Sequence, residues 1–210
     1  MLTLSNVTIQ LAEKYLFQDF NASIQAGEVL SIMGPSGCGK STLLDYLSGS
    51  LSPAFQSSGK LLLHDKELNM LPIEKRRVGI LYQESLLFPH LTNLENLIFA
   101  IPETITGKQR QELALHKLSE FNLADKAHSL PNALSGGQKA RIALLRTLLS
   151  EPQYLLLDEP FGKLDATLRG NVREFVLEQI QTTQLPTLLV THDAEDTDAM
   201  GSNTIHLSLT

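Results

Sequence analysis

The fold of this 210-residue chain is decided by one stretch, Val29-Leu30-Ser31-Ile32-Met33-Gly34-Pro35-Ser36-Gly37-Cys38-Gly39-Lys40-Ser41-Thr42. Residues 29–33 form a mainly apolar run, typical of a strand buried on both faces of a parallel sheet. Residues 34–41 fit the pattern G-x-x-x-x-G-K-[ST], a loop whose backbone N–H groups hold phosphates. In this pattern Lys40 reaches the β- and γ-phosphates and Ser41 ligates Mg²⁺. The stretch therefore predicts a nucleotide site at the end of a buried strand.

Three other strand-like runs also end at polar residues. Residues 78–82 stop at Gln83, residues 154–157 lead to Asp158 and Glu159, and residues 187–191 lead to His192. Ligands of parallel sheets gather at the carboxyl ends of the strands. We therefore expect these side chains and the phosphate loop to meet at one edge of the sheet.

A second glycine-rich anion site follows about a hundred residues after the first. Leu134-Ser135-Gly136-Gly137-Gln138 comes just before a helical pattern that runs from about Lys139 to Leu149. Free N–H groups and the positive end of a helix dipole favour an anion at such a position. Because one nucleotide hardly needs two such sites, the second one calls for a separate explanation.

The phosphate loop, the Leu-Ser-Gly-Gly-Gln motif and then Tyr154-Leu155-Leu156-Leu157-Asp158-Glu159-Pro160, in this order, resemble the ATP-binding-cassette (ABC) ATPases over nearly the whole chain. In that family two cassettes meet head to tail, and each nucleotide lies between the phosphate loop of one subunit and the signature motif of the other. The resemblance implies ATP and Mg²⁺ as cofactors. It also implies a second copy or a paralogous cassette subunit as partner, whose nucleotide would contact Ser135, Gly136 and Gly137.

The same resemblance assigns roles to individual residues. Thr42 adds a contact to the α-phosphate, and Asp158 is the acidic partner of the metal, with Ser41 and Gln83 as its other ligands. Glu159 polarises the attacking water, and His192 contacts the γ-phosphate and holds Glu159 with its water. Both are therefore expected to be catalytic.

The match weakens at two places. The family commonly stacks adenine on an aromatic residue, and the aligned position here is Leu11, with Tyr15 four residues later. Either Tyr15 stacks on the base or Leu11 offers an apolar contact only. The family also more often has Ser-Ala-Leu-Asp where this chain has Gly162-Lys163-Leu164-Asp165, which puts the usual cross-subunit contacts in doubt.

The expected fold class is α/β, a P-loop NTPase core with a mixed, mainly parallel sheet, organised as a single domain over residues 1–210. Alternating apolar residues between Leu2 and Ile24, joined by residues 59–64, predict an N-terminal antiparallel β subdomain. A helical subdomain is expected at about 84–140, made of short helices because Pro102 and Gly107 interrupt the pattern. Within it, residues 85–90 either line a groove for a membrane partner's helix or belong to the core of that subdomain.

Composition limits the function. Seventeen Lys and Arg against 23 Asp and Glu give a net charge of −6, which argues against nucleic acid as a partner. No apolar run approaches the roughly 20 residues of a membrane helix, so transmembrane permease subunits must be separate chains. No signal peptide precedes the first strand, which predicts a cytoplasmic protein, peripheral on the inner face of the membrane.

The preferred function is the ATP-hydrolysing subunit of an ABC membrane transporter, with an importer favoured over an exporter. A soluble cassette ATPase acting on DNA or ribosomes is the alternative. A phosphate-loop kinase or GTPase is a further rival, but it would not need the signature motif.

Overall fold

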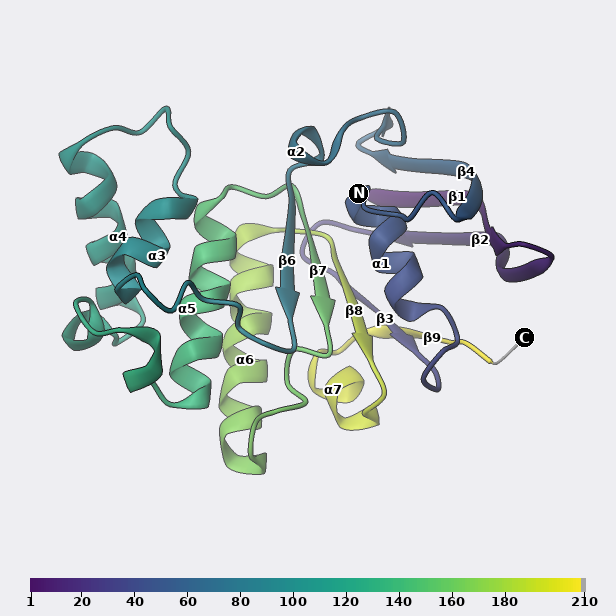
Figure 1. Cartoon of the computed structure of the whole chain (residues 1–210). Helices are drawn as coiled ribbons and strands as arrows, with labels where there is room; N and C mark the ends of the chain where they lie inside the picture. Colours follow the sequence, from purple (N-terminus) through teal and green to yellow (C-terminus); the bar gives the residue numbers. More distant parts are fainter. Residues whose placement is uncertain (209–210) are drawn as a thin grey trace.

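The structure is a computed structural model that describes residues 1–208, and of Thr167 only the backbone (Figure 1). Residues 209 and 210, the end of the predicted domain, lie outside the described residues. An antiparallel sheet has the order β2-β1-β4-β5 and is built from β1 (Leu2–Leu11), β2 (Lys14–Ile24), β4 (Phe55–Leu63) and β5 (Lys66–Glu67). A parallel sheet has the order β6-β7-β8-β3-β9 and is built from β3 (Val29–Met33), β6 (Val78–Tyr82), β7 (Tyr154–Asp158), β8 (Thr187–Thr191) and β9 (Asn203–His206).

Helices alternate with these strands along the chain. The α-helices are α1 (Lys40–Ser48), α2 (Ile73–Arg76), α3 (Asn93–Ala100), α4 (Lys108–Glu120), α5 (Gly136–Leu149), α6 (Ala166–Thr183) and α7 (Ala194–Ala199). Two 3₁₀ turns are η1 (Ala124–Lys126) and η2 (Pro131–Ala133). Within the described part of the chain, no helix has both the length and the apolar character needed to cross a membrane.

The antiparallel sheet follows the alternation of its sequence. In β1, Leu2, Leu4, Val7 and Ile9 are buried, and the residues between them are more exposed. The register shifts between Leu4 and Val7, which keeps the apolar residues on the buried face despite the uneven spacing. β1 pairs with both β2 and β4, which confirms the predicted joining of the first strands by residues 59–64.

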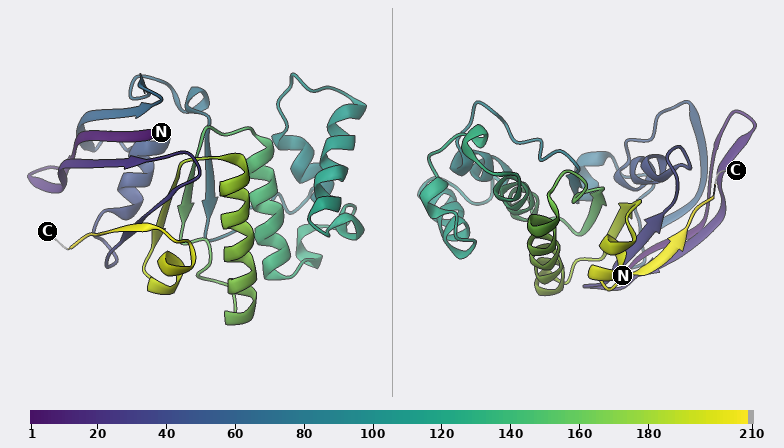
Figure 2. Two further views of the ribbon diagram at one scale, coloured as in Figure 1. Left: turned by 180° about the vertical axis from the view of Figure 1, so that it is seen from behind. Right: turned by 90° about the horizontal axis from the view of Figure 1, so that it is seen from below.

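The parallel sheet is covered on both faces, as its apolar runs predicted. In β7, Tyr154 and Leu156 pack with α1 and the antiparallel sheet, whereas Leu155 and Leu157 pack with α5 and α6. The view from below in Figure 2 shows these layers side by side. Burial on both faces explains why β7 is continuously apolar rather than alternating.

The helices after β6 form a separate apolar cluster against α5. Thr92 begins α3 with a capping box, and Pro102 and Gly107 lie between α3 and α4. Leu97 of α3 and Leu118 of α4 are fully buried in this cluster together with Ile142 of α5. The segment predicted as short helices is therefore confirmed as such, and its packing extends into the helix that follows the signature motif.

The register of the parallel sheet brings its carboxyl ends together. Tyr82 of β6 lies opposite Asp158 of β7, which lies opposite Val190 of β8, and Thr191 lies opposite Met33 of β3. The residues that follow these strands, the predicted site residues among them, consequently leave the sheet at one edge (Figure 1).

Candidate functional site

The phosphate loop joins β3 to α1, and its last glycine has a backbone conformation that few other residues adopt. Gly39 has φ 101°, and a Cβ at this position would lie 3.1 Å from Cε2 of Phe17. The positive φ favours glycine here, and the close approach to Phe17 leaves little room for a side chain. The sharp turn places Lys40 at the first position of α1, beside the carbonyl groups of its own loop.

The lysine of this loop is buried and points into the turn. Lys40 is 8% exposed, and its Nζ donates hydrogen bonds to the carbonyl oxygens of Gly34 at 2.7 Å and Pro35 at 3.0 Å. A buried ammonium group whose hydrogen bonds go to neutral carbonyls, with only the Asp158 carboxylate acting on it from nearby, can still gain from a further negative charge. The geometry therefore suits an incoming phosphate, which would supply that charge.

A pocket of about 270 Å³ brings most of the predicted phosphate ligands together. It is lined by Leu16, Ser36, Gly37, Gly39, Lys40, Ser41, Thr42, Asp158, Glu159 and Val190. The loop and the two carboxylates at the end of β7, more than a hundred residues apart in sequence, thus face one cavity. Gly34, Pro35 and Cys38 do not line this pocket; a Cβ on Gly34 would lie 2.8 Å from Cys38 Sγ, and Cys38 is only 5% exposed, so these two residues pack inside the turn.

Asp158 lies in an environment that disfavours its negative charge. Burial raises the pKa of its carboxyl group above the ordinary value, and the nearby carboxylates of Glu159 and Asp45 raise it further, whereas Lys40 lowers it. A half-buried carboxylate with two acidic neighbours gains from a cation.

The pocket fits a magnesium ion that is held mainly by a nucleotide. Among residues 1–208, no group of three or more His, Cys, Asp or Glu side chains gathers to hold a metal. Mg²⁺ is usually held by one or two carboxylates together with substrate phosphates and water. Ser41 and Asp158, which face the same pocket, match this limited ligand set.

Glu159 has an unusual backbone conformation and contacts His192. Its φ is 45°, in the left-handed region that costs a residue with a side chain about 1–3 kcal/mol. Its backbone N–H donates to the carbonyl of Val190 at 2.9 Å, and its Oε1 lies 3.2 Å from His192 Nδ1. The imidazole is 63% exposed and the Glu159 carboxylate 27% exposed. The structure therefore brings the two residues with predicted catalytic roles into direct contact.

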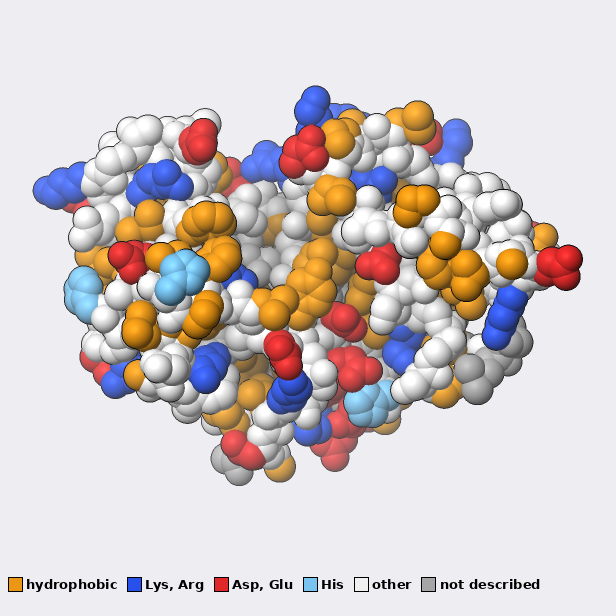
Figure 3. Space-filling model, viewed as in Figure 1, with side chains coloured by type: hydrophobic (Ala, Val, Ile, Leu, Met, Phe, Trp, Pro, Cys, Tyr) orange, Lys and Arg blue, Asp and Glu red, His pale blue; other side chains and the backbone are white. Residues whose placement is uncertain are grey.

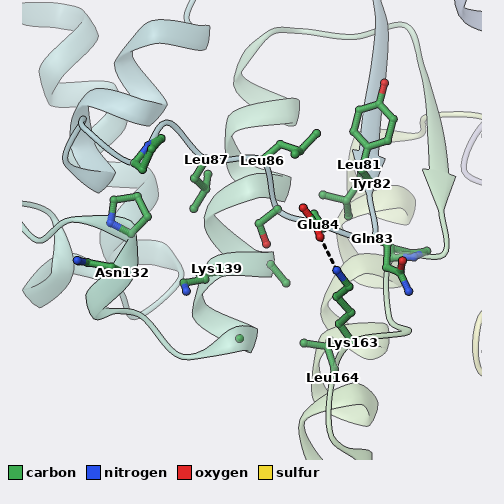
Figure 4. Close-up of a pocket in the computed structure, with 16 residues that line it drawn as sticks. Leu81, Tyr82, Gln83, Glu84, Leu86, Leu87, Asn132, Lys139, Lys163 and Leu164 are labelled. Carbon is green, nitrogen blue, oxygen red and sulfur yellow. Dashed lines mark hydrogen bonds and ion pairs between the residues drawn. The ribbon is translucent and has the colours of Figure 1, made fainter.

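Gln83 lies outside the phosphate pocket. It is exposed, and a Cβ on Gly162 would lie 2.8 Å from its Nε2, so the side chain rests on the loop after β7. The next residue, Glu84, forms an ion pair with Lys163 of that loop, as the dashed line in Figure 4 shows. Lys163, at which this loop departs from the family pattern, is thus linked to the segment that follows Gln83.

Gln83 and this ion pair border a groove of about 560 Å³ between the sheet and α5. Figure 4 shows Leu86 and Leu87 on one side of it and Leu164 on another. A second hollow, which is lined by Val78, Ile80, Leu86, Phe88 and Phe99 among others, continues along β6. Figure 3 shows hydrophobic side chains gathered in this region, between the helical part and the sheet.

The signature motif begins α5 with a capping box. Ser135 Oγ accepts a hydrogen bond from the N–H of Gln138 at 3.3 Å, and Gln138 Oε1 accepts one from the N–H of Ser135 at 3.0 Å. Gly137 packs against α6, because a Cβ there would lie 2.4 Å from Leu168 Cδ1. Neither these residues nor Gly136 line the phosphate pocket. Figure 1 shows the starts of α5 and α1 on opposite sides of β7 and β8.

Both candidates for contacting adenine lie at the β1–β2 hairpin. Leu11 is 44% exposed and pairs with Lys14, and Tyr15 is 46% exposed and pairs with Gln10. The hairpin residue that lines the phosphate pocket is Leu16. No motif singles out Leu16, but its position next to Tyr15 in the predicted strand region is a signal that could have identified it.

Two arginines of α6, which no sequence motif indicates, bind residues that follow His192 in the chain. Arg169 forms an ion pair with Asp193 at 2.7 Å, and Arg173 is buried against Asp196. Their i,i+4 spacing after Asp165 places them on one face of a helix, which is the signal that was available. Arg146 of α5 donates a hydrogen bond to the carbonyl oxygen of Leu86 at 2.9 Å.

Comparison with known proteins agrees with this geometry. The family model described as ABC transporter matches residues 17–162. An uncharacterised ABC transporter ATP-binding protein, YnjD of Escherichia coli, is 41% identical over 202 residues, which are 96% of this chain and 93% of that protein. The Fe(3+) ions import ATP-binding protein FbpC of Rhizobium etli is 38% identical over 97% of this chain, and the sulfate/thiosulfate import ATP-binding protein CysA of Pectobacterium atrosepticum is 37% identical over 91% of it. This chain spans 57% and 58% of the length of those two import proteins.

Solved structures give the same result. The ATP-binding cassette MJ0796, in a dimeric post-hydrolysis state with ADP and Pi, superposes with a TM-score of 0.79 at 31% identity and covers 100% of this chain and 96% of that one. A second dimeric structure of that cassette gives 0.78 at 33% identity, covering 99% of this chain and 94% of that one. These matches confirm the predicted fold class and ATP hydrolysis, and they do not favour the soluble alternative. The chain belongs to the ABC transporter family, as an ATP-binding and ATP-hydrolysing subunit.

Proposed function

We propose that this chain drives an import system as a head-to-tail dimer, with each ATP bound between the phosphate loop of one subunit and the signature motif of the other. The observation that carries the proposal is the separation of two anion sites within one subunit. The phosphate pocket contains Lys40, Asp158 and Glu159, whereas Ser135 at the start of α5 lies outside it. The dimeric cassette structures support this arrangement.

Within the closed site, each residue would act on the γ-phosphate or on the attacking water. Lys40 would turn from its loop carbonyls to the β- and γ-phosphates, and Thr42 would contact the α-phosphate. Glu159, held by His192, would orient the water in line with the γ-phosphate. Mg²⁺, held by Ser41 and Asp158, would neutralise charge on the phosphate oxygens.

Gln83 would become a metal ligand only after leaving its position on Gly162. Because Gln83 borders the groove between the sheet and α5, a partner that occupies this groove would shift Gln83 toward or away from the metal. We propose that residues 84–140 act as the helical subdomain of the single domain 1–210. We also propose that the groove receives a helix of a transmembrane permease subunit, which would hold the chain at the cytoplasmic face of the membrane.

The relatives whose names state a cargo import Fe(3+) ions or sulfate and thiosulfate. Their names support import as the direction of transport. The cargo itself is selected by the membrane chains.

The test is the variant Glu159→Gln, which keeps the shape of the side chain and removes its charge. We expect ATP binding without turnover, and a dimer on size-exclusion chromatography when ATP is present. Glu174→Gln, an exposed position on α6, is the matched control and should hydrolyse ATP normally. A Glu159→Gln protein that remains a monomer and hydrolyses ATP at the normal rate would refute the proposal.

A further inference from the structure

Arg169 connects the loop after β7 with the residue that follows His192. Its Nη1 donates to Asp193 Oδ2 at 2.7 Å, and its Nη2 donates to the carbonyl oxygen of Leu164 at 3.3 Å. The arginine and aspartate side chains are 24% and 28% exposed, so the pair is largely shielded from water. One planar guanidinium group therefore fixes two loops relative to each other.

Thr191, which precedes His192, is linked through Asp196 to Arg173, which lies on α6 like Arg169. Thr191 Oγ1 donates to Asp196 Oδ2 at 2.7 Å, and Asp196 Oδ1 accepts from Arg173 Nε at 2.7 Å. Arg173 and Asp196 are buried, at 8% and 2% exposed. Both chain neighbours of His192 are thus bound, directly or through one carboxylate, to arginines on one face of α6.

His192 itself has little to hold its side chain. The imidazole is 63% exposed and lies 3.2 Å from Glu159. A side chain with so much freedom takes its position mainly from its backbone. The backbone at His192 is in turn set by the contact of Asp193 with Arg169 of α6 and by that of Thr191 with Asp196 of α7, which Arg173 of α6 binds.

We propose that Arg169 is a positioning residue for ATP hydrolysis, which acts through Asp193 to hold His192 against Glu159. The inference rests on the proposed role of His192. Because Arg169 also binds the carbonyl next to Lys163, it sets His192 relative to the loop that continues from Glu159 toward α6. Loss of Arg169 would leave the fold and the phosphate pocket in place and would loosen the contact between His192 and Glu159.

The first measurement compares turnover with ATP affinity. We expect Arg169→Gln to lower kcat about tenfold or more, since small displacements of a positioned group can cost up to about 100-fold. Affinity for ATP, measured without Mg²⁺, should stay the same, because Arg169 lies outside the phosphate pocket. Arg169→Lys keeps a positive charge beside Asp193 but lacks the two-pronged donor. Its kcat should lie between those of the wild-type protein and Arg169→Gln.

The decisive experiment is a double-mutant cycle that combines Arg169→Gln with His192→Ala. The rate measured for each protein is that of single-turnover hydrolysis of radiolabelled ATP. If Arg169 acts through His192, then Arg169→Gln lowers the hydrolysis rate of the wild-type protein. In a protein that already carries His192→Ala, the same substitution should cause no further loss of rate. Equal losses in both backgrounds would show that Arg169 acts elsewhere and would overturn the inference.

Two comparisons keep the result interpretable. Arg77→Gln breaks an ion pair with Glu151 that is distant from His192 and should leave turnover unchanged. If Arg169→Gln fails to fold, the cycle is repeated with Arg169→Lys. If His192→Ala hydrolyses ATP slowly while the Arg169 variants hydrolyse it at the normal rate, only the positioning role of Arg169 is overturned. Normal turnover in His192→Ala would overturn the proposed function of His192 as well.

Discussion

His192 Nδ1 lies 3.2 Å from Glu159 Oε1, across the ends of the adjacent parallel strands β8 and β7. The same two strand ends are joined by a backbone hydrogen bond from Glu159 to the carbonyl of Val190. Main chain and side chains therefore hold the two strand ends together. The left-handed backbone of Glu159 turns its carboxylate into the phosphate pocket rather than along the chain direction of β7.

His192→Ala should lower the turnover number about 100-fold and leave ATP affinity nearly unchanged. Positioned acid–base groups typically contribute about 10²–10⁴-fold to a rate, and His192 acts here on Glu159 rather than on the binding of the loop to phosphates. Steady-state phosphate release and equilibrium binding of ATP measure the two quantities. His116→Ala is the control, because His116 is similarly exposed and ion-paired with Glu120, but on α4. A His192→Ala protein with a normal turnover number would contradict the expectation.

Asp158→Asn should stabilise the nucleotide-free protein at neutral pH. Burial and two neighbouring carboxylates raise the pKa of Asp158, so the folded state binds its proton more tightly than the unfolded state does. The contribution of Asp158 to stability is therefore most favourable below its ordinary pKa and declines as the pH rises through the raised one. The amide lacks this penalty, and we expect a Tm increase of about 2–4 °C at pH 7, the effect of about 1 kcal/mol in a domain of this size.

The increase should shrink as the pH falls through the raised pKa of Asp158, because the wild-type carboxylate then takes up its proton and the penalty disappears. Differential scanning fluorimetry across this pH range measures it, with the exposed Asp125→Asn as control. With ATP and Mg²⁺ added, the wild-type protein should have the higher Tm of the two, since its carboxylate then has a cation to bind. A lower Tm of Asp158→Asn at pH 7 without nucleotide would disprove the electrostatic account.

Lys163→Ala should return the pKa of Glu84 toward its ordinary value. The hydrogen bond and the charge of Lys163 lower that pKa, and both are lost in the variant. A ¹³C NMR titration of labelled Glu carboxyl groups follows the change, with Lys108→Ala, which removes the exposed partner of Glu112, as control. A Glu84 pKa that does not move would mean that the ion pair is absent in solution.

Tyr15→Ala should weaken ATP binding by roughly 5- to 150-fold, because stacking of a base on an aromatic ring contributes about 1–3 kcal/mol. Leu11→Ala is tested beside it, since both side chains lie at the same hairpin and are similarly exposed. Affinities for ATP and GTP are compared for each variant. If Tyr15→Ala binds ATP normally and Leu11→Ala does not, the adenine contact belongs to Leu11.

The buried strands could be predicted closely from sequence. Strands β3, β6 and β8 have the predicted bounds, because a strand covered on both faces is mainly apolar and contrasts with the polar and glycine-rich residues that follow it. The short helices α3 and α4 were predictable from the breaks at Pro102 and Gly107. The phosphate loop and the carboxylates at the end of β7 could likewise be placed at one edge of the sheet.

The contacts that join the loops could not be predicted. The ion pair of Glu84 with Lys163, the contact of Gln83 with Gly162 and the bond from Arg169 to Asp193 connect residues far apart in sequence. Each depends on how one loop turns over another, and even the helical spacing of Arg169 and Arg173 predicts only their shared face and not their partners. Motifs therefore identify the groups that meet the nucleotide, but not the contacts that hold these groups in place.

The capping box at Ser135 has a consequence for the speed of assembly. A hydroxyl group has one proton to donate and two lone pairs, and the cap with Gln138 uses only a lone pair. An arriving phosphate from a second subunit would therefore meet a helix end that is already folded, with the serine proton still available. Nothing in α5 has to unwind or refold before contact, so the rate at which two subunits close would be set by their collision and rotation.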